Sequence, residues 1–161
     1  DRSVSRGLGD VYKRQVLELL DKTEFPVRHL CLEITERCRS LPVSVINERM
    51  AVLRGYGIKF AMDDFGTGSS SSAMALEMLI DEIKIDMSFI RKILVNKKNK
   101  AIVQSMVDFA NAANIKSCLE GVENKALEDY LRTVGATWFQ GYYYSKPVGA
   151  DELEILLSAK K

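Results

Sequence analysis

Residues 57–71 read GIKFAMDDFGTGSSS, and their pattern indicates the class of fold. The apolar run ends at two adjacent acids, Asp63 and Asp64, and a Gly-Thr-Gly turn follows them. A short apolar run that ends at turn residues is typical of a buried strand. We therefore predict a strand over residues 59–65 whose C-terminal end carries carboxylates.

Similar runs occur on both sides of this strand. Four more strands are predicted at residues 29–35, 82–87, 116–120 and 137–141, and amphipathic helices at residues 16–27, 43–54, 101–113, 125–134 and 151–159. Strands that alternate with helices imply a parallel sheet with right-handed crossovers. The predicted fold class is therefore α/β.

Length and charge limit the classes of protein to which the chain can belong. Its 161 residues fit one domain, and 23 Lys and Arg against 22 Asp and Glu give a net charge of +1. This balance excludes the basic field that duplex nucleic acid requires. Three cysteines without a CxxC pair are typical of a reducing compartment.

The sequence also contains neither a secretory signal nor an apolar run of the roughly 18 residues that a membrane span needs. We therefore expect a cytoplasmic chain without a membrane segment, although the parent protein could be anchored through upstream segments. Residues 1–15 (DRSVSRGLGDVYKRQ) show no apolar periodicity. We interpret them as a non-native or unstructured leader and assign the domain to residues 16–161.

Acidic residues recur at or near the ends of the predicted strands. They are Glu33, Asp63, Asp64, Asp86 and Glu120, and Lys84 precedes Asp86 by two residues. The C-terminal ends of parallel strands meet at one face, so these side chains should converge. Converging carboxylates need a neutralising partner, and Mg²⁺ or Mn²⁺ prefers oxygen ligands.

Five segments carry a resemblance to a known family. They are CLEITE (31–36), GIKFAMDDFGTGSSS (57–71), IKIDMSF (83–89), EGVE (120–123) and QGYYYSKP (140–147). In this order and spacing they resemble the EAL-domain family, the bacterial cyclic-di-GMP phosphodiesterases, over residues 16–157. The resemblance implies a (β/α)₈ TIM-type barrel with two Mg²⁺ or Mn²⁺ ions at its mouth, where cyclic di-GMP is hydrolysed to linear pGpG.

The resemblance also implies roles for individual residues. The metal ligands would be Glu33, Asp63, Asp64, Asp86 and Glu120, with Asp63 as the bridging ligand. The catalytic set would be Lys84, Glu120 and Asp64, with Lys84 holding the attacking water. Substrate binding or support of the site loops would come from Glu36, Gly66, Thr67, Gly68, Glu123 and Gln140.

The chain departs from the family pattern upstream of Glu33. The signature Glu-Ala-Leu tripeptide and an Asn on the intervening strand, both metal ligands in the family, have no match there. We therefore expect a partial barrel of about the last five strand-helix units. On its own this chain should be inactive and either poorly stable or self-associating. In the parent protein we expect a homodimer, which could carry a fused sensory or diguanylate-cyclase-like domain.

Two other functions stay open at this point. A degenerate EAL module could act as a non-catalytic cyclic-di-GMP receptor or protein-interaction domain, and an unrelated metal-dependent hydrolase could use the same fold. The retained acids and Lys84 favour the enzyme, because a binding module has no need of a water-activating set. Trp138 could stack on guanine, but aromatic residues in a barrel strand favour a place in the core.

Overall fold

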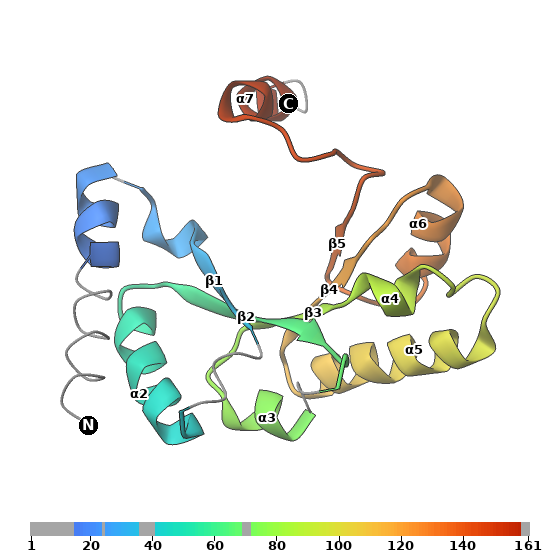
Figure 1. Cartoon of the computed structure of the whole chain (residues 1–161), viewed down its shortest axis with the longest axis horizontal. Coiled ribbons are helices and arrows are strands. Elements are labelled where there is room, and N and C mark those ends of the chain that lie inside the picture. The colour runs from blue at the N-terminus through green and yellow to red at the C-terminus, as the bar shows by residue number, and fades with distance from the viewer. Residues whose placement is uncertain (1–14, 24, 36–40, 69–71, 159–161) are drawn as a thin grey trace.

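The computed structural model describes residues 15–23, 25–35, 41–68 and 72–158. Its centre is one sheet of five parallel strands in the order β1-β2-β3-β4-β5 (Figure 1). The strands are β1 (Cys31–Ile34), β2 (Lys59–Phe65), β3 (Glu82–Ile85), β4 (Lys116–Glu120) and β5 (Trp138–Gln140). Every strand pairs with the next one along the chain, so the predicted parallel α/β arrangement is confirmed.

Helices cover the sheet unevenly. They are a helix at residues 15–23, then α2 (Val43–Arg54), α3 (Ser72–Glu77), α4 (Met87–Ile90), α5 (Lys97–Ala112), α6 (Lys125–Arg132) and α7 (Ala150–Ser158), and a 3₁₀ turn, η1, spans Val27–His29. In Figure 1, α2, α3 and α5 lie along one side of the curved sheet, while α7 lies on the opposite side, away from it. The hydrophobic core lies between the sheet and the first group.

The core explains why these elements form. Alternate residues of β2 and β3, including Phe60, Met62 and Ile83, point toward Met50 of α2 and Val103 of α5, and all five are buried. Each large apolar side chain buried in this way contributes about 1.5–3 kcal/mol before the entropy cost. Each crossover helix therefore packs on the side of the sheet that carries the apolar side chains of the strands.

Several predicted boundaries shift for local reasons. The first strand begins at Cys31 because His29 belongs to η1, and the third ends at Ile85 because Asp86 caps α4. α5 begins at Lys97 rather than at residue 101, since the side chain of Asn96 accepts a hydrogen bond from the Lys98 amide. The helix before β1 includes residue 15, which belongs to the segment interpreted as a leader.

The expectation that Trp138 lies in the core is wrong. Trp138 is 49% exposed, with the Lys116 ammonium 5.2 Å from its ring centre, and Tyr142 to Tyr144 are exposed as well. Residues of α7, including Ile155 and Leu157, are also exposed, and no residue of this helix is buried. No helix in the described ranges is long and apolar enough to cross a membrane.

Candidate metal and catalytic site

The end of β2 is irregular where its two acids lie. The register with β3 shifts between Met62 and Phe65, and Asp64 adopts a positive φ of 52°. The Thr67 amide and hydroxyl both donate to the Asp64 carbonyl oxygen, at 3.2 and 2.8 Å, which closes the turn. Adjacent side chains of a regular strand point to opposite faces, whereas this bulge re-aims one of them.

As a result, carboxylates from two strands come together. Asp63, Asp64 and Glu120 each offer an oxygen, and these atoms lie within 4.8 Å of one another. Asp63 and Glu120 are partly buried and Asp64 is exposed. Three carboxylates with one open side fit a hard divalent cation that keeps some of its water ligands.

Lys84 on β3 joins these acids to Glu33 on β1. Its Nζ lies 2.7 Å from Glu33 Oε1, 2.8 Å from Glu120 Oε1 and 3.4 Å from Asp63 Oδ1. All four residues belong to the sheet face opposite the hydrophobic core, as the alternation of Glu33 with Leu32 and Ile34 predicts. One buried ammonium therefore contacts carboxylates from three other strands.

The surroundings of Lys84 keep it charged. Burial alone pulls the pKa of an ammonium group down. The hydrogen bonds to Glu120 and Glu33 and the charge of Asp63 outweigh that effect, and the pKa of Lys84 is raised above its usual value. The group is thus a fixed positive charge among the acids.

Asp86 lies apart from this cluster. Its side chain accepts a hydrogen bond of 2.9 Å from the Ser88 amide and caps the N-terminus of α4. Burial acts to raise the pKa of Asp86, but the hydrogen bonds from Ser88 and the Met87 amide lower it overall. The structure explains Asp86 as a helix cap, and its role as a metal ligand stays a prediction.

The loops after β4 and β5 are tied together beside Glu120. Gln140 is the register partner of Glu120, and its carbonyl oxygen accepts from the Val122 amide at 3.0 Å. The Tyr143 amide donates in turn to the Val122 carbonyl oxygen. A Cβ on Gly141 would collide with the Val122 backbone, so only glycine permits this approach. Gln140 therefore lies beside Glu120 in the sheet, and its role in substrate binding stays a prediction.

The turn after β2, residues Gly66 to Gly68, requires glycine for structural reasons. Gly66 has a φ of 95°, and a Cβ there would collide with the Met106 methyl group and crowd Phe89. Around Gly68 there is open space. The turn supports Asp64 through Thr67, while substrate binding by these residues stays a prediction. Glu36, predicted to anchor the neighbouring loop, lies outside the described residues.

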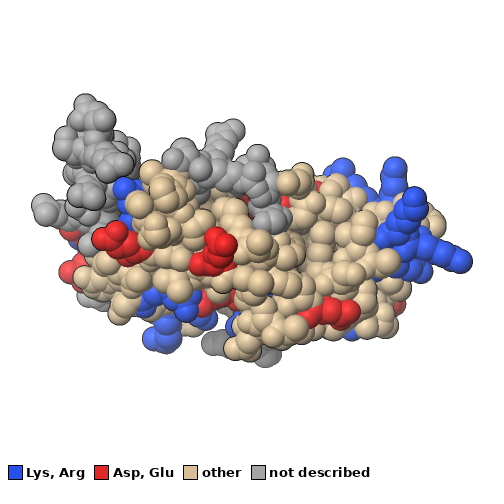
Figure 2. Space-filling view, turned by 90° about the horizontal axis from the view of Figure 1, so that it is seen from below, with Lys and Arg blue, Asp and Glu red and all other residues tan. Residues whose placement is uncertain are grey.

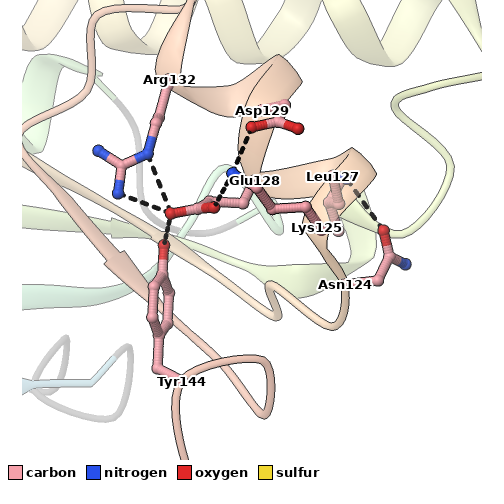
Figure 3. Close-up of polar contacts among 7 residues, drawn as sticks. All are labelled: Asn124, Lys125, Leu127, Glu128, Asp129, Arg132 and Tyr144. Atoms are coloured by element: carbon pink, nitrogen blue, oxygen red, sulfur yellow. Dashed lines mark hydrogen bonds and ion pairs between the residues drawn. The ribbon is translucent and has the colours of Figure 1, made fainter.

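Sequence patterns did not reveal the polar network on α6 that Figure 3 shows. Glu128 is buried, and it accepts hydrogen bonds from Lys125 at 3.0 Å and from Arg132 at 2.9 and 2.6 Å. The Tyr144 hydroxyl points to the same carboxylate at 3.4 Å and links the segment after β5 to α6. The i, i+3 and i, i+4 spacing of these charges was the available signal.

The helix cap next to this network is Asn124, whose side chain accepts from the Leu127 amide. Glu123, predicted to support this helix or the substrate, is exposed and lies 3.9 Å from Arg91 Nε. Asn124 therefore caps α6, and Glu123 links its start to the segment after α4.

One cavity lies at the other ends of the strands from Asp63 and Glu120. It has a volume of about 470 Å³ and is lined by residues at or next to the starts of the strands, among them Cys31, Lys59, Glu82 and Lys116. Cys118 is buried in β4 between the two ends, and burial raises the pKa of its thiol to about 12. A thiol with such a raised pKa stays protonated and unreactive at neutral pH.

Comparison with known proteins places this geometry in context. The model of the EAL domain family matches residues 5–147. Cyclic di-GMP phosphodiesterase PdeB of Shewanella oneidensis is 36% identical over 124 residues, which cover 77% of this chain and 14% of PdeB. The chain thus spans a small part of this relative.

Solved structures agree in fold. The EAL domain of Mycobacterium smegmatis DcpA superposes with a TM-score of 0.85 at 29% identity, covering 91% of this chain and 66% of that one. Klebsiella pneumoniae BlrP1, in a complex with manganese and cyclic di-GMP, matches with a TM-score of 0.75 at 29% identity over 83% of this chain and 34% of its own. The five parallel strands therefore correspond to part of a known barrel-like fold.

Proposed function

This chain belongs to the EAL domain family, and from that premise we propose that the protein containing it hydrolyses cyclic di-GMP to linear pGpG. The observation that carries the proposal is the contact of Lys84 with Glu33, Asp63 and Glu120 next to the cluster of Asp63, Asp64 and Glu120. Such an arrangement suits hydrolysis of a phosphodiester, where charge develops on oxygen.

The carboxylates would hold the metal ions. Asp63, Asp64 and Glu120 supply oxygen donors of the type that Mg²⁺ or Mn²⁺ prefers, and Glu33 and Asp86 would complete the predicted set. Two bound ions supply an acidified water and stabilise the attacking and leaving oxygens. The remaining ligands would come from parts of the parent protein outside these 161 residues.

Lys84 would place the attacking water and offset phosphate charge. Its raised pKa keeps the ammonium group protonated at neutral pH, and Glu33 and Glu120 fix the direction of the side chain. Gln140, beside Glu120, would donate its amide to the substrate or to a water at the rim. The Gly-Thr-Gly turn would hold the Asp64 carboxylate in place.

The organisation of the parent protein belongs to the same proposal. We place it in the cytoplasm or on its membrane face, as a homodimer, with a sensory or diguanylate-cyclase-like domain fused to it. The assignment of residues 1–15 as a leader stays a prediction, and the family match begins inside that segment, at residue 5.

Turnover of cyclic di-GMP by the parent protein in Mn²⁺ tests the proposal. We expect pGpG as the product, and we expect Asp63→Asn to abolish its formation while Asp108→Asn, an exposed acid on α5, leaves it unchanged. Tight binding of cyclic di-GMP without turnover would instead identify the non-catalytic receptor.

A further inference from the structure

The connection between α4 and α5 has a shape fixed by the protein interior. Ile93 is fully buried and its amide donates to the Ile90 carbonyl oxygen at 3.0 Å. The Asn96 amide donates to the Lys92 carbonyl oxygen at 2.9 Å, and the Asn99 side chain donates to the Phe89 carbonyl oxygen at 2.7 Å. The side chains between these anchors are therefore presented in a defined direction.

Two of those side chains are apolar and face solvent. Val95 is 87% exposed, more than any other large hydrophobic side chain in the described ranges, and the adjacent Leu94 is 42% exposed. The buried Ile93 anchors the turn, whereas neither Leu94 nor Val95 belongs to the hydrophobic core. A pair of aliphatic groups at a protruding turn marks a surface that can enter an apolar phase.

Cations surround the two aliphatic groups. Residues 91–100 read RKILVNKKNK, with five basic residues and no acid, in a chain whose net charge is only +1. Of these, Arg91, Lys92, Lys97 and Lys98 are exposed. In Figure 2 the basic side chains gather at the end of the molecule where Figure 1 shows this connection.

The ion pair between Arg91 and Glu123 is long and exposed. Arg91 lies 3.9 Å from Glu123, and both side chains are more than half exposed. Exposed pairs of this kind contribute little, so the positive charge stays available for a partner. Lys100 is turned aside, with its ammonium 4.7 Å from the centre of the Tyr130 ring.

We propose that residues 91–98, the basic turn, dock on the surface of an anionic lipid bilayer. Leu94 and Val95 enter the boundary between headgroups and acyl chains, and Arg91, Lys92, Lys97 and Lys98 contact lipid phosphates and carboxylates. An aliphatic tip between cations suits this phase better than a nucleic acid, whose backbone offers only charge to such a surface. The proposal is independent of phosphodiester hydrolysis.

Co-sedimentation of the full chain with vesicles tests this docking. We expect the chain to bind vesicles that contain phosphatidylserine, to bind pure phosphatidylcholine much more weakly, and to be released by high salt. Each basic residue near an anionic surface changes the partition coefficient about fivefold, so Lys97→Glu with Lys98→Glu should lower it roughly 25-fold or more. Val95→Ser should lower it about tenfold, because less apolar surface leaves water.

Matched variants separate the basic turn from general charge and hydrophobicity. Lys22→Glu with Arg28→Glu changes net charge equally at exposed sites elsewhere in the chain, and Leu76→Ser removes a side chain of α3 that is 64% exposed. Both should bind vesicles like the unchanged chain. Circular dichroism confirms that each variant is folded.

Three results would overturn the proposal. The first is equal sedimentation with charged and neutral vesicles. The second is equal loss of binding in the basic-turn and control variants. The third is binding of a DNA oligonucleotide by the basic turn without binding of phosphatidylserine vesicles, which would identify a different partner.

Discussion

The ammonium group of Lys84 on β3 lies 2.8 Å from a carboxylate oxygen of Glu120 on β4. The two side chains come from adjacent strands, and the same nitrogen also reaches Glu33 on β1 at 2.7 Å. Lys84 is buried, so it cannot exchange these contacts for water without a change in the sheet. The Lys84 ammonium group therefore links β3 to acids on β1, β2 and β4.

Replacing Lys84 by Met removes the cation and leaves Glu33 and Glu120 facing each other. We expect the free energy of unfolding at pH 7 to fall by about 2 kcal/mol, below the 3–5 kcal/mol of a fully buried pair because water reaches these acids. Urea denaturation measures the change, with Lys146→Met as the exposed control. Equal stability of the two variants would show that the contact contributes nothing.

The same variant predicts a pH dependence. The pKa of Lys84 is raised in the folded protein, so its stabilisation is complete below the pKa of an unfolded lysine, about 10.4, and is lost as pH rises through the folded value. The difference in unfolding free energy between the unchanged chain and Lys84→Met should therefore be constant near neutrality and shrink in strong alkali. A difference that grows with pH would contradict the assignment.

Replacing Asp63 by Asn should weaken binding of Mn²⁺. The variant removes one negative oxygen from the cluster with Asp64 and Glu120, and we expect the dissociation constant to rise more than about tenfold. Isothermal titration with Mn²⁺ measures it, and Asp108→Asn is the control. The cluster would not be a metal site if both variants bound Mn²⁺ like the unchanged chain.

The network around Glu128 predicts acid sensitivity. Hydrogen bonds from Lys125 and Arg132 lower the pKa of this carboxyl group, so its contribution is present above the pKa of an unfolded Glu, about 4.3, and disappears as pH falls through the lower folded value. Glu128→Gln should lower the melting temperature at pH 7 and have little effect at strongly acid pH. Glu152→Gln on α7 is the control, and an effect independent of pH would point to packing instead.

The exposed face of α7 predicts self-association of the chain. Ile155 and Leu157 are 68% and 62% exposed, and burying them between copies would be favourable. Ile155→Ser with Leu157→Ser should shift the chain toward monomer in sedimentation velocity. Leu76→Ser should not, and an unchanged distribution in both variants would locate the contact elsewhere.

The regular parts of the fold could be predicted from local patterns. β2, β4 and α2 have the predicted boundaries because each is a continuous apolar or amphipathic run between turn residues. The start of α5 was predicted four residues too late, since the lysines of its first turn resemble a solvated loop and its start depends on the Asn96 cap. Short helices such as α4 lack a periodic signal, because four residues make barely one turn.

Burial was harder to predict than secondary structure. Trp138 was expected in the core because of its type, yet it begins β5 on the polar face of the sheet and stays half exposed. Glu128 is charged and would be expected at the surface, yet it is buried. Lys125, Arg132 and Tyr144 donate hydrogen bonds to its carboxylate oxygens. The exposure of Trp138 depends on its place in the sheet, whereas the burial of Glu128 combines two partners within four residues with the more distant Tyr144.

The parallel α/β sheet and the gathering of acids at the ends of its strands could be predicted from residue order alone, because periodicity and turn chemistry are local properties. Tertiary structure, by contrast, decides which of these acids come into contact. A shifted register and a positive φ turn Asp64 toward Asp63 and Glu120, and the cap of α4 turns Asp86 away. Lys84 can bind three acids only because β1 to β4 lie side by side in one sheet, so its pKa and the make-up of the site arise from contacts between strands.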